Sequence, residues 1–397
     1  MEAMKEVYLV DGVRTAIGRM GGSLSMFRPE ELAAFALKGL IEKTGIDPSI
    51  VDDVLVGHAC TNNAAVNIAR WAALKAGFPY SVPAQTVERQ CGSALQTINS
   101  AAANIKAGFG EVYIAGGCES WSNQPYLMER QKQPFSLVPP KYITRQVGPT
   151  EETDAPMGIV AEILADEFGV SREEQDAFGL RSQTRAIQAI KEGYFKEEIV
   201  PVKVPQRKGD PIIFDQDEHP RETNPEKLAK LRPAFKKDGT VTAGTSSGLN
   251  DGAVANLVAS QEKCEELSLK PLARFVSCAL GAREPKYMGV APVIAMEKAL
   301  VNAGLTMADM DVVECNEAFA SQTLAVMKSL KKNGHEFDEE KWNPNGGAIA
   351  FGHPNGMSGG RLALAVVHQL KRIQGRYGMA TLCIGGGQGI AAIFERI

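Results

Sequence analysis

Two distant parts of the chain share one pattern of apolar and polar positions. In the first part, apolar residues between 94 and 105 recur at the spacing of one helix face, and residues 111–115 follow as a short apolar run. In the second part, residues 362–370 keep the same helical spacing, and residues 379–384 form the apolar run. This spacing predicts a helix followed by a buried strand in each part. Because glycine weakens strands, we expect the first strand to stop at glycines 116–117.

The segments before these two parts also correspond to each other. Residues 51–57 and 308–314 predict strands, and residues 30–45 and 292–304 predict the helices that precede them. The order helix, strand, helix, strand therefore occurs twice. Such alternation predicts a pseudo-duplicated α/β protein with a parallel or mixed sheet that helices cover.

The domain organisation follows from length and composition. With 397 residues, the chain exceeds the size at which one core usually stops growing, so we expect two or three domain-sized units. We assign the N-terminal half to residues 1–120 plus 250–270 and the C-terminal half to 271–397. Residues 121–249 are rich in proline and charge, with helical spacing over 158–193. Since long irregular segments in compact enzymes are often binding elements, we expect an inserted lid there.

Composition narrows the class of protein. The chain is 44% hydrophobic and 23% charged, as soluble globular enzymes are, and its net charge of −4 argues against a nucleic-acid partner. The seven cysteines are irregularly spaced without a Cys-x-x-Cys pair, which supports neither zinc nor disulfides and favours a reducing, cytoplasmic compartment. No apolar run approaches the ~20 residues that cross a bilayer, and no secretory signal is visible, so we expect no membrane partner.

Cys91 is the first candidate for chemistry. It stands in the stretch Gln90-Cys91-Gly92-Ser93, where a loop turns into the first predicted central helix. The start of a helix presents unpaired N–H groups and a partial positive charge, both of which favour a thiolate. We therefore expect a reactive cysteine whose pKa lies below the usual value of about 8.5.

Three further residues in the C-terminal half are candidate partners. His353 lies in a loop rich in glycine and proline, which must make a tight, specific turn, whereas the remaining histidines have no comparable setting. Cys383 ends a predicted strand before Gly385, whose backbone N–H can approach a substrate oxygen. Asn316 also follows a strand and can orient water, although Asn-Glu alone more often caps a helix. The other five cysteines are interpreted as core residues.

Together these segments resemble the thiolase family almost from end to end. The matching motifs occur in the family's order, and they lie at residues 11–18, 90–96, 157–158, 241–248, 316–319, around His353 and around Cys383. The resemblance implies a five-layered αβαβα architecture with an inserted lid or loop domain. It also implies a homodimer or homotetramer assembled through the sheet edge of the N-terminal half.

The resemblance implies a role for each candidate. Cys91 is acylated, and His353 takes its proton and, with a water held by Asn316, helps to bind the thioester oxygen. Cys383 is the second acid and base, while the N–H groups of Cys91 and Gly385 form the other oxyanion hole. The expected enzyme is an acyl-CoA C-acetyltransferase, which cleaves 3-ketoacyl-CoA with coenzyme A or condenses two acetyl-CoA molecules. It needs no metal and no organic cofactor, because coenzyme A is a substrate.

The resemblance also implies the substrate contacts. Coenzyme A enters under the lid, where Ser247 contacts the pantetheine arm and Arg221 lies by the adenine. Met157 and Phe319 belong to the same expected binding region. Two alternatives stay open, a decarboxylating ketoacyl synthase and a non-catalytic acyl-CoA-binding protein of this fold.

Some positions depart from the family's usual residues. Met357 replaces an alanine beside the histidine turn, so an altered pocket is expected, and Thr245 stands where asparagine is frequent. Ala291 and Gly360 also replace commoner residues. Pro156 stands where biosynthetic members tend to carry histidine, which favours a degradative enzyme.

Overall fold

The computed structural model describes residues 5–61, 64–135 and 137–397. Eleven strands form one sheet, whose main path runs β11-β12-β13-β10-β1-β9-β5-β3-β4. β2 and β6 pair with β9 and β1, and β7 and β8 form a separate pair. The strands are β1 (Val7–Thr15), β2 (Gly18–Arg19), β3 (Asp53–Gly57), β4 (Ala84–Val87), β5 (Val112–Ser120), β6 (Ile199–Val200), β7 (Val202–Val204), β8 (Ile212–Phe214), β9 (Asn250–Ser260), β10 (Ala273–Ala282), β11 (Met310–Cys315), β12 (Tyr377–Ile384) and β13 (Gln388–Arg396).

Strand pairing repeats between the two halves of this sheet. β3 and β5 are parallel, and β9 and β1 follow as antiparallel neighbours. In the same way β11 and β12 are parallel, and β13 and β10 follow antiparallel. β4 extends the first half parallel to β3, and Trp342 makes a single parallel bridge to β11 at the corresponding place. The halves join where β1 pairs with β10, so the predicted duplication is confirmed.

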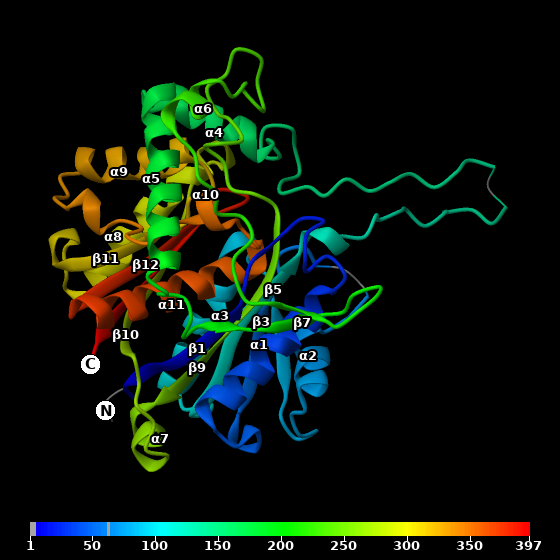
Figure 1. The fold of residues 1–397 in the computed structure, drawn as a ribbon, viewed down its shortest axis with the longest axis vertical. Coiled ribbons are helices and arrows are strands. Elements are labelled where there is room, and N and C mark those ends of the chain that lie inside the picture. Colours follow the sequence, from blue (N-terminus) through cyan, green and yellow to red (C-terminus); the bar gives the residue numbers. More distant parts are fainter. Residues whose placement is uncertain (1–4, 62–63, 136) are drawn as a thin grey trace.

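Helices cover this sheet in layers (Figure 1). α1 and α2 pack on the outer face of the first half, and α8 and α9 pack on the outer face of the second. α3 and α11 share one apolar core with strands of both halves and form the middle layer. The helices are α1 (Pro29–Thr44), α2 (Ile68–Ala76), α3 (Ser93–Lys106), α4 (Met157–Glu167), α5 (Arg172–Lys191), α6 (Pro225–Ala229), α7 (Gln261–Glu266), α8 (Ala291–Ala303), α9 (Ala320–Lys332), α10 (Ala348–Phe351) and α11 (Asn355–Ile373). The expected five-layered αβαβα architecture is therefore present.

Two expectations about element ends are wrong. β5 runs through Gly117 to Ser120 instead of stopping at the glycines. Gly117 permits a close approach of β5 to α11, since a Cβ at residue 117 would lie 1.9 Å from the carbonyl oxygen of Gly356 at the start of α11. The predicted helix over 158–193 is divided into α4 and α5 because Gly169 adopts a left-handed conformation, with φ of 56°, between them.

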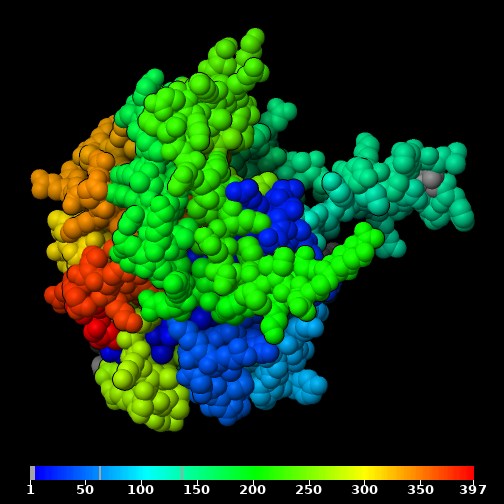
Figure 2. Space-filling model, viewed as in Figure 1, coloured from blue at the N-terminus to red at the C-terminus, as the bar shows by residue number. Residues whose placement is uncertain are grey.

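The segment between β5 and β9 holds α4, α5, α6 and the short strands β6, β7 and β8. Part of it reaches far from the body of the molecule as an arm, coloured teal in Figures 1 and 2. A bridge between Met128 and Tyr142 joins the two sides of this arm. Among the described helices, none is both long and apolar enough to cross a membrane.

Candidate active site

Cys91 lies at the junction of the two central helices. It occupies a short 3₁₀ turn, Gln90–Gly92, that leads directly into α3. Gln90 has a φ of 44°, an uncommon value for a residue other than glycine, so the turn is held in a strained form. The Cys91 side chain is half-buried, and the Asn355 side chain at the start of α11 donates a hydrogen bond to its sulfur, with Nδ2 3.2 Å from Sγ.

The expectation of a lowered Cys91 pKa is wrong. Burial raises the pKa of the Cys91 thiol, because removal from water disfavours the charged sulfur. Hydrogen bonds from Asn355 and from the backbone N–H groups of Gly385 and of Cys91 itself act in the opposite direction, although they do not outweigh burial. The thiol therefore needs a base to become a nucleophile.

One ring nitrogen of His353 is fixed by a short hydrogen bond, and the other keeps a lone pair. Its Nδ1 lies 2.6 Å from Ser358 Oγ, which itself donates to the carbonyl oxygen of Pro354 at 3.0 Å. Because that carbonyl can only accept, the Ser358 hydroxyl must accept from Nδ1–H. The network thus places the proton on Nδ1 and leaves a lone pair on Nε2.

The charge state of His353 suits a base. Burial, followed by the nearby Arg361, lowers the pKa of His353 from 6.5 to about 4. The imidazole is therefore neutral at physiological pH. Its backbone N–H donates to Asn250 Oδ1 at 3.1 Å, which fixes the loop against β9.

Asn316 lies next to the second ring nitrogen of His353, Nε2. The two side chains approach to 3.5 Å between Asn316 Nδ2 and His353 Nε2. Asn316 Oδ1 is buried and has no hydrogen-bond partner among the described residues. Because buried polar groups normally have one, the site suits an ordered water. The neighbouring Glu317 accepts from Ser182 and Asn343, which ties the end of β11 to the loop before α10.

Cys383 and Gly385 lie at the end of β12. Cys383 is 1% exposed, and its pKa is raised well above the usual value by burial and then by the proximity of Cys91 and Cys315. Gly385 directs its backbone N–H to Cys91. Gly386 and Gly387 have φ values of 79° and 86°, which glycine adopts without strain, and they turn the chain back into β13. The structure thus brings both thiols and the Gly385 donor together.

The predicted coenzyme A contacts lie on segments that lead to His353. Ser247 donates its backbone N–H to the carbonyl of Ala318 at 3.0 Å, and the next residues, 248–249, pair with His353. Phe319 and Met157 both pack on the apolar core of the second half. Arg221 is exposed and donates its backbone N–H to Gln183 on α5 at 2.9 Å. The segments that carry Ser247, Phe319 and His353 are thus joined by backbone hydrogen bonds.

Comparison with known proteins identifies the family. The model for the thiolase N-terminal domain matches residues 7–262, and the model for the thiolase C-terminal domain matches residues 269–396. The chain belongs to the thiolase family. Its relatives are acyltransferases, and the chain is an acyltransferase of this family.

The names of its relatives state more than one activity. It is 48% identical over 395 residues to the acetyl-CoA acetyltransferase of Chromobacterium violaceum, with 98% of this chain and 100% of that protein covered. It is 45% identical to the β-ketoadipyl-CoA thiolase of Acinetobacter baylyi, with 99% and 100% covered. The Bacillus anthracis acetyl-CoA acetyltransferase structure matches with a TM-score of 0.93 at 40% identity and covers 100% of both chains. Human mitochondrial 3-ketoacyl-CoA thiolase, solved in complex with CoA, matches with a TM-score of 0.91 at 40% identity over 99% and 98% of the chains.

Sequence reasoning missed two residues of this thiolase site, Asn355 and Glu119. Glu119 is fully buried at the end of β5 and accepts from the backbone N–H groups of Ala59, Cys60 and Gly356. His58 lies 3.2 Å from its second oxygen. A strand assumed to stop at glycines 116–117 put Glu119 in a loop, which hid its position at the base of α11.

Two of the departures from usual thiolase residues, Met357 and Thr245, have structural explanations. Met357 is fully buried in an apolar cluster with Ile17, Ala94 and Phe351, so its side chain fills the core and does not support the expected change in pocket shape. Thr245 accepts the N–H of Thr242 on its hydroxyl at 2.9 Å and so closes the turn before Ser247.

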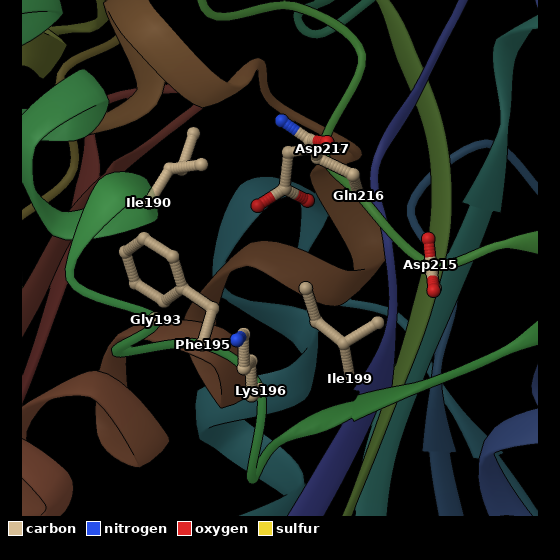
Figure 3. A pocket seen from close by; sticks show the side chains of 8 residues that line it. All are labelled: Ile190, Gly193, Phe195, Lys196, Ile199, Asp215, Gln216 and Asp217. Atoms are coloured by element: carbon tan, nitrogen blue, oxygen red, sulfur yellow. The ribbon is translucent and has the colours of Figure 1, made fainter.

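Two cavities differ in whether residues of the candidate active site line them. A cavity of about 250 Å³ lies between α5 and the segment around Asp217, where Phe195 and Ile190 face it, and no predicted site residue lines it (Figure 3). A polar cavity of about 320 Å³ is lined by Gln90 and Gly385 and opens beside Cys91. The second one adjoins the site.

Proposed function

We propose that this thiolase transfers acyl groups between coenzyme A thioesters through an acyl intermediate on Cys91. The observation that carries the proposal is the Cys91 thiol, which lies by the Cys383 thiol and accepts from the backbone N–H of Gly385 and from Asn355, two positions after His353. The imidazole of His353 is neutral and keeps its lone pair on Nε2. A buried thiol with a raised pKa needs a neutral base of this kind.

In the cleavage direction, His353 takes the proton from Cys91, and the thiolate attacks the 3-keto carbon of the substrate. The bond between carbons 2 and 3 breaks, and the leaving acetyl-CoA enolate takes a proton from the Cys383 thiol. The Cys383 thiolate then removes the proton of coenzyme A, whose sulfur attacks the acyl group and releases Cys91 as a thiolate, which takes its proton back from His353. Condensation follows the same steps in reverse.

Two groups of hydrogen-bond donors stabilise the negative charge that develops on the substrate oxygens. The N–H groups of Gly385 and Cys91 point to the sulfur of Cys91, where an oxyanion of the acyl intermediate would form. A water on Asn316, together with His353, serves the thioester oxygen of the acetyl-CoA enolate. Neither step needs a metal or an organic cofactor.

The proposed coenzyme A site lies along Ser247, Phe319 and Met157, with Arg221 near the adenine and phosphates. Partial burial lowers the pKa of Arg221, and the nearby positive charge of Arg19 lowers it further. Neither arginine forms an ion pair among the described residues. Two unpaired cations suit a phosphate-bearing ligand. The solved human relative in complex with CoA supports this choice of ligand class. We also propose a cytoplasmic homodimer or homotetramer that acts in the degradative direction.

Thiolysis of acetoacetyl-CoA and of longer 3-ketoacyl-CoA substrates tests the proposal. Cys91→Ala is expected to abolish thiolysis and to prevent the mass increase of one acetyl group that acetyl-CoA produces on the intact protein. Cys278→Ala is the matched control, since it removes a thiol remote from the site. Normal thiolysis by Cys91→Ala would contradict the mechanism, and a strict need for a malonyl thioester would favour a ketoacyl synthase.

A further inference from the structure

The side chain of Asn355 is held between an indole and the sulfur of Cys91. Trp121 Nε1 donates to Asn355 Oδ1 at 2.7 Å, and Asn355 Nδ2 donates to Cys91 Sγ at 3.2 Å. An indole N–H can only donate, so the oxygen of the carboxamide must face Trp121. The amide nitrogen is therefore directed at the sulfur.

Trp121 and Asn355 are both held in position by hydrogen bonds that neighbouring residues make to other parts of the fold. Trp121 follows β5 immediately, and the next residue, Ser122, donates its backbone N–H to Asp251 of β9 at 3.0 Å. On the other side, the N–H of Gly356 donates to the buried Glu119 at 3.1 Å. The carboxamide is thus fixed before any substrate binds, which is the condition for effective electrostatic stabilisation.

We propose that Asn355, oriented by Trp121, is a further catalytic residue that stabilises the thiolate of Cys91. The catalytic role of Asn355 rests on the proposed function, whereas its stabilisation of the Cys91 thiolate does not. Hydrogen bonds to an ionised acceptor are about twice as strong as neutral ones, so the donor favours the thiolate over both the thiol and the thioester. A carboxamide does this without titrating, so it does not compete with His353 for the proton of Cys91.

The same contact serves both half-reactions. In the first, Cys91 becomes a thiolate to attack, and in the second, Cys91 leaves the acyl group as a thiolate when coenzyme A attacks. An interaction that is stronger with the charged sulfur lowers both barriers. Trp121 is a positioning residue, because it acts only through Asn355.

The test is the pH dependence of Cys91 alkylation by iodoacetamide, followed by mass spectrometry of the peptide that carries Cys91. Asn355→Leu is expected to raise the pKa of Cys91 by about one unit, which means a roughly tenfold slower alkylation at neutral pH. Trp121→Phe is expected to shift the profile in the same direction by less. Adding Trp121→Phe to Asn355→Leu is expected to change nothing further.

Asn355→Ala provides a second variant if leucine prevents folding, and thermal unfolding reports on the fold of each. Asn302→Ala is the matched control, because Asn302 is an exposed carboxamide on α8. An alkylation profile in folded Asn355→Ala that equals the wild-type profile would overturn the inference. Since alkylation needs no substrate, this result is distinguishable from a failure of thiolysis, which would overturn the proposed function instead.

Discussion

At the scale of single residues, burial acts in opposite directions on the two groups that start the proposed reaction. It raises the pKa of the Cys91 thiol and lowers the pKa of His353 to about 4. Both groups are therefore neutral at physiological pH, and the proton moves when the substrate is present. A lowered cysteine pKa would instead have implied a preformed ion pair of thiolate and imidazolium.

The lowered pKa of His353 makes stability depend on pH. Below pH 6.5 the unfolded chain binds a proton at this residue, whereas the folded chain binds it only near pH 4. Stability is therefore full above pH 6.5 and falls by about 3 kcal/mol as the pH drops to 4. Urea unfolding of the wild type and of His353→Asn over this range checks the prediction, and the variant is expected to show the shallower slope. Parallel curves would contradict it.

A second prediction concerns Glu119. Its Oε2 accepts three backbone N–H groups and its Oε1 accepts from the side chain of Gln124, so Glu119→Gln replaces the second acceptor by a donor. We expect a loss of about 1–3 kcal/mol in the free energy of unfolding, since a buried donor is left without a partner. Acetoacetyl-CoA thiolysis should also slow, because Gly356 adjoins Asn355. Denaturant titration and initial rates measure both, and wild-type values of both would refute the assigned role.

At the scale of elements, hydrophobic spacing was sufficient to predict α3, α11 and the repeated order of helices and strands. The end of β5 was not predictable, because the reason for Gly117 is the carbonyl of Gly356, far along the chain. Asn355 and Cys91 are likewise 264 positions apart, and no local pattern reports on such a contact. The pKa of Cys91 was predicted in the wrong direction, because sequence does not measure burial.

The close packing of β5 against α11 yields a third prediction. In Gly117→Ala the new methyl group would lie 1.9 Å from a backbone oxygen, so α11 must shift. Overpacking of this kind costs typically about 1–3 kcal/mol. Denaturant midpoints measure the loss, and thiolysis should fall as well since α11 carries Asn355. A variant with wild-type stability and rate would show that β5 and α11 separate easily.

At the scale of the whole molecule, the segment between β5 and β9 is attached to the core by a buried cation. Arg14 of β1 lies 2.6 Å from Glu198 and 2.7 Å from Asp217, and all three side chains are almost fully buried. Asp217 also accepts the backbone N–H of Ile17 at 2.8 Å. These contacts set the position of the segment that carries Arg221.

Removal of this cation is the fourth prediction. Arg14→Leu leaves two buried carboxylates unpaired, so we expect a loss of about 3–5 kcal/mol in the free energy of unfolding. Lys38→Leu is the matched control, because Lys38 pairs with Glu42 on the exposed face of α1, and its loss should cost less than about 1 kcal/mol. Equal effects of the two changes in urea unfolding would show that burial does not matter at Arg14.

The position of β13 has a consequence for the growing chain. β13 lies between β10 and β12, so the sheet of the second half stays open until residues 388–396 have left the ribosome. Cys91 emerges long before its partners His353 and Cys383. During synthesis Cys91 therefore lacks the base and the acid of the proposed reaction, so we expect nascent chains to show no acyl transfer before folding is finished.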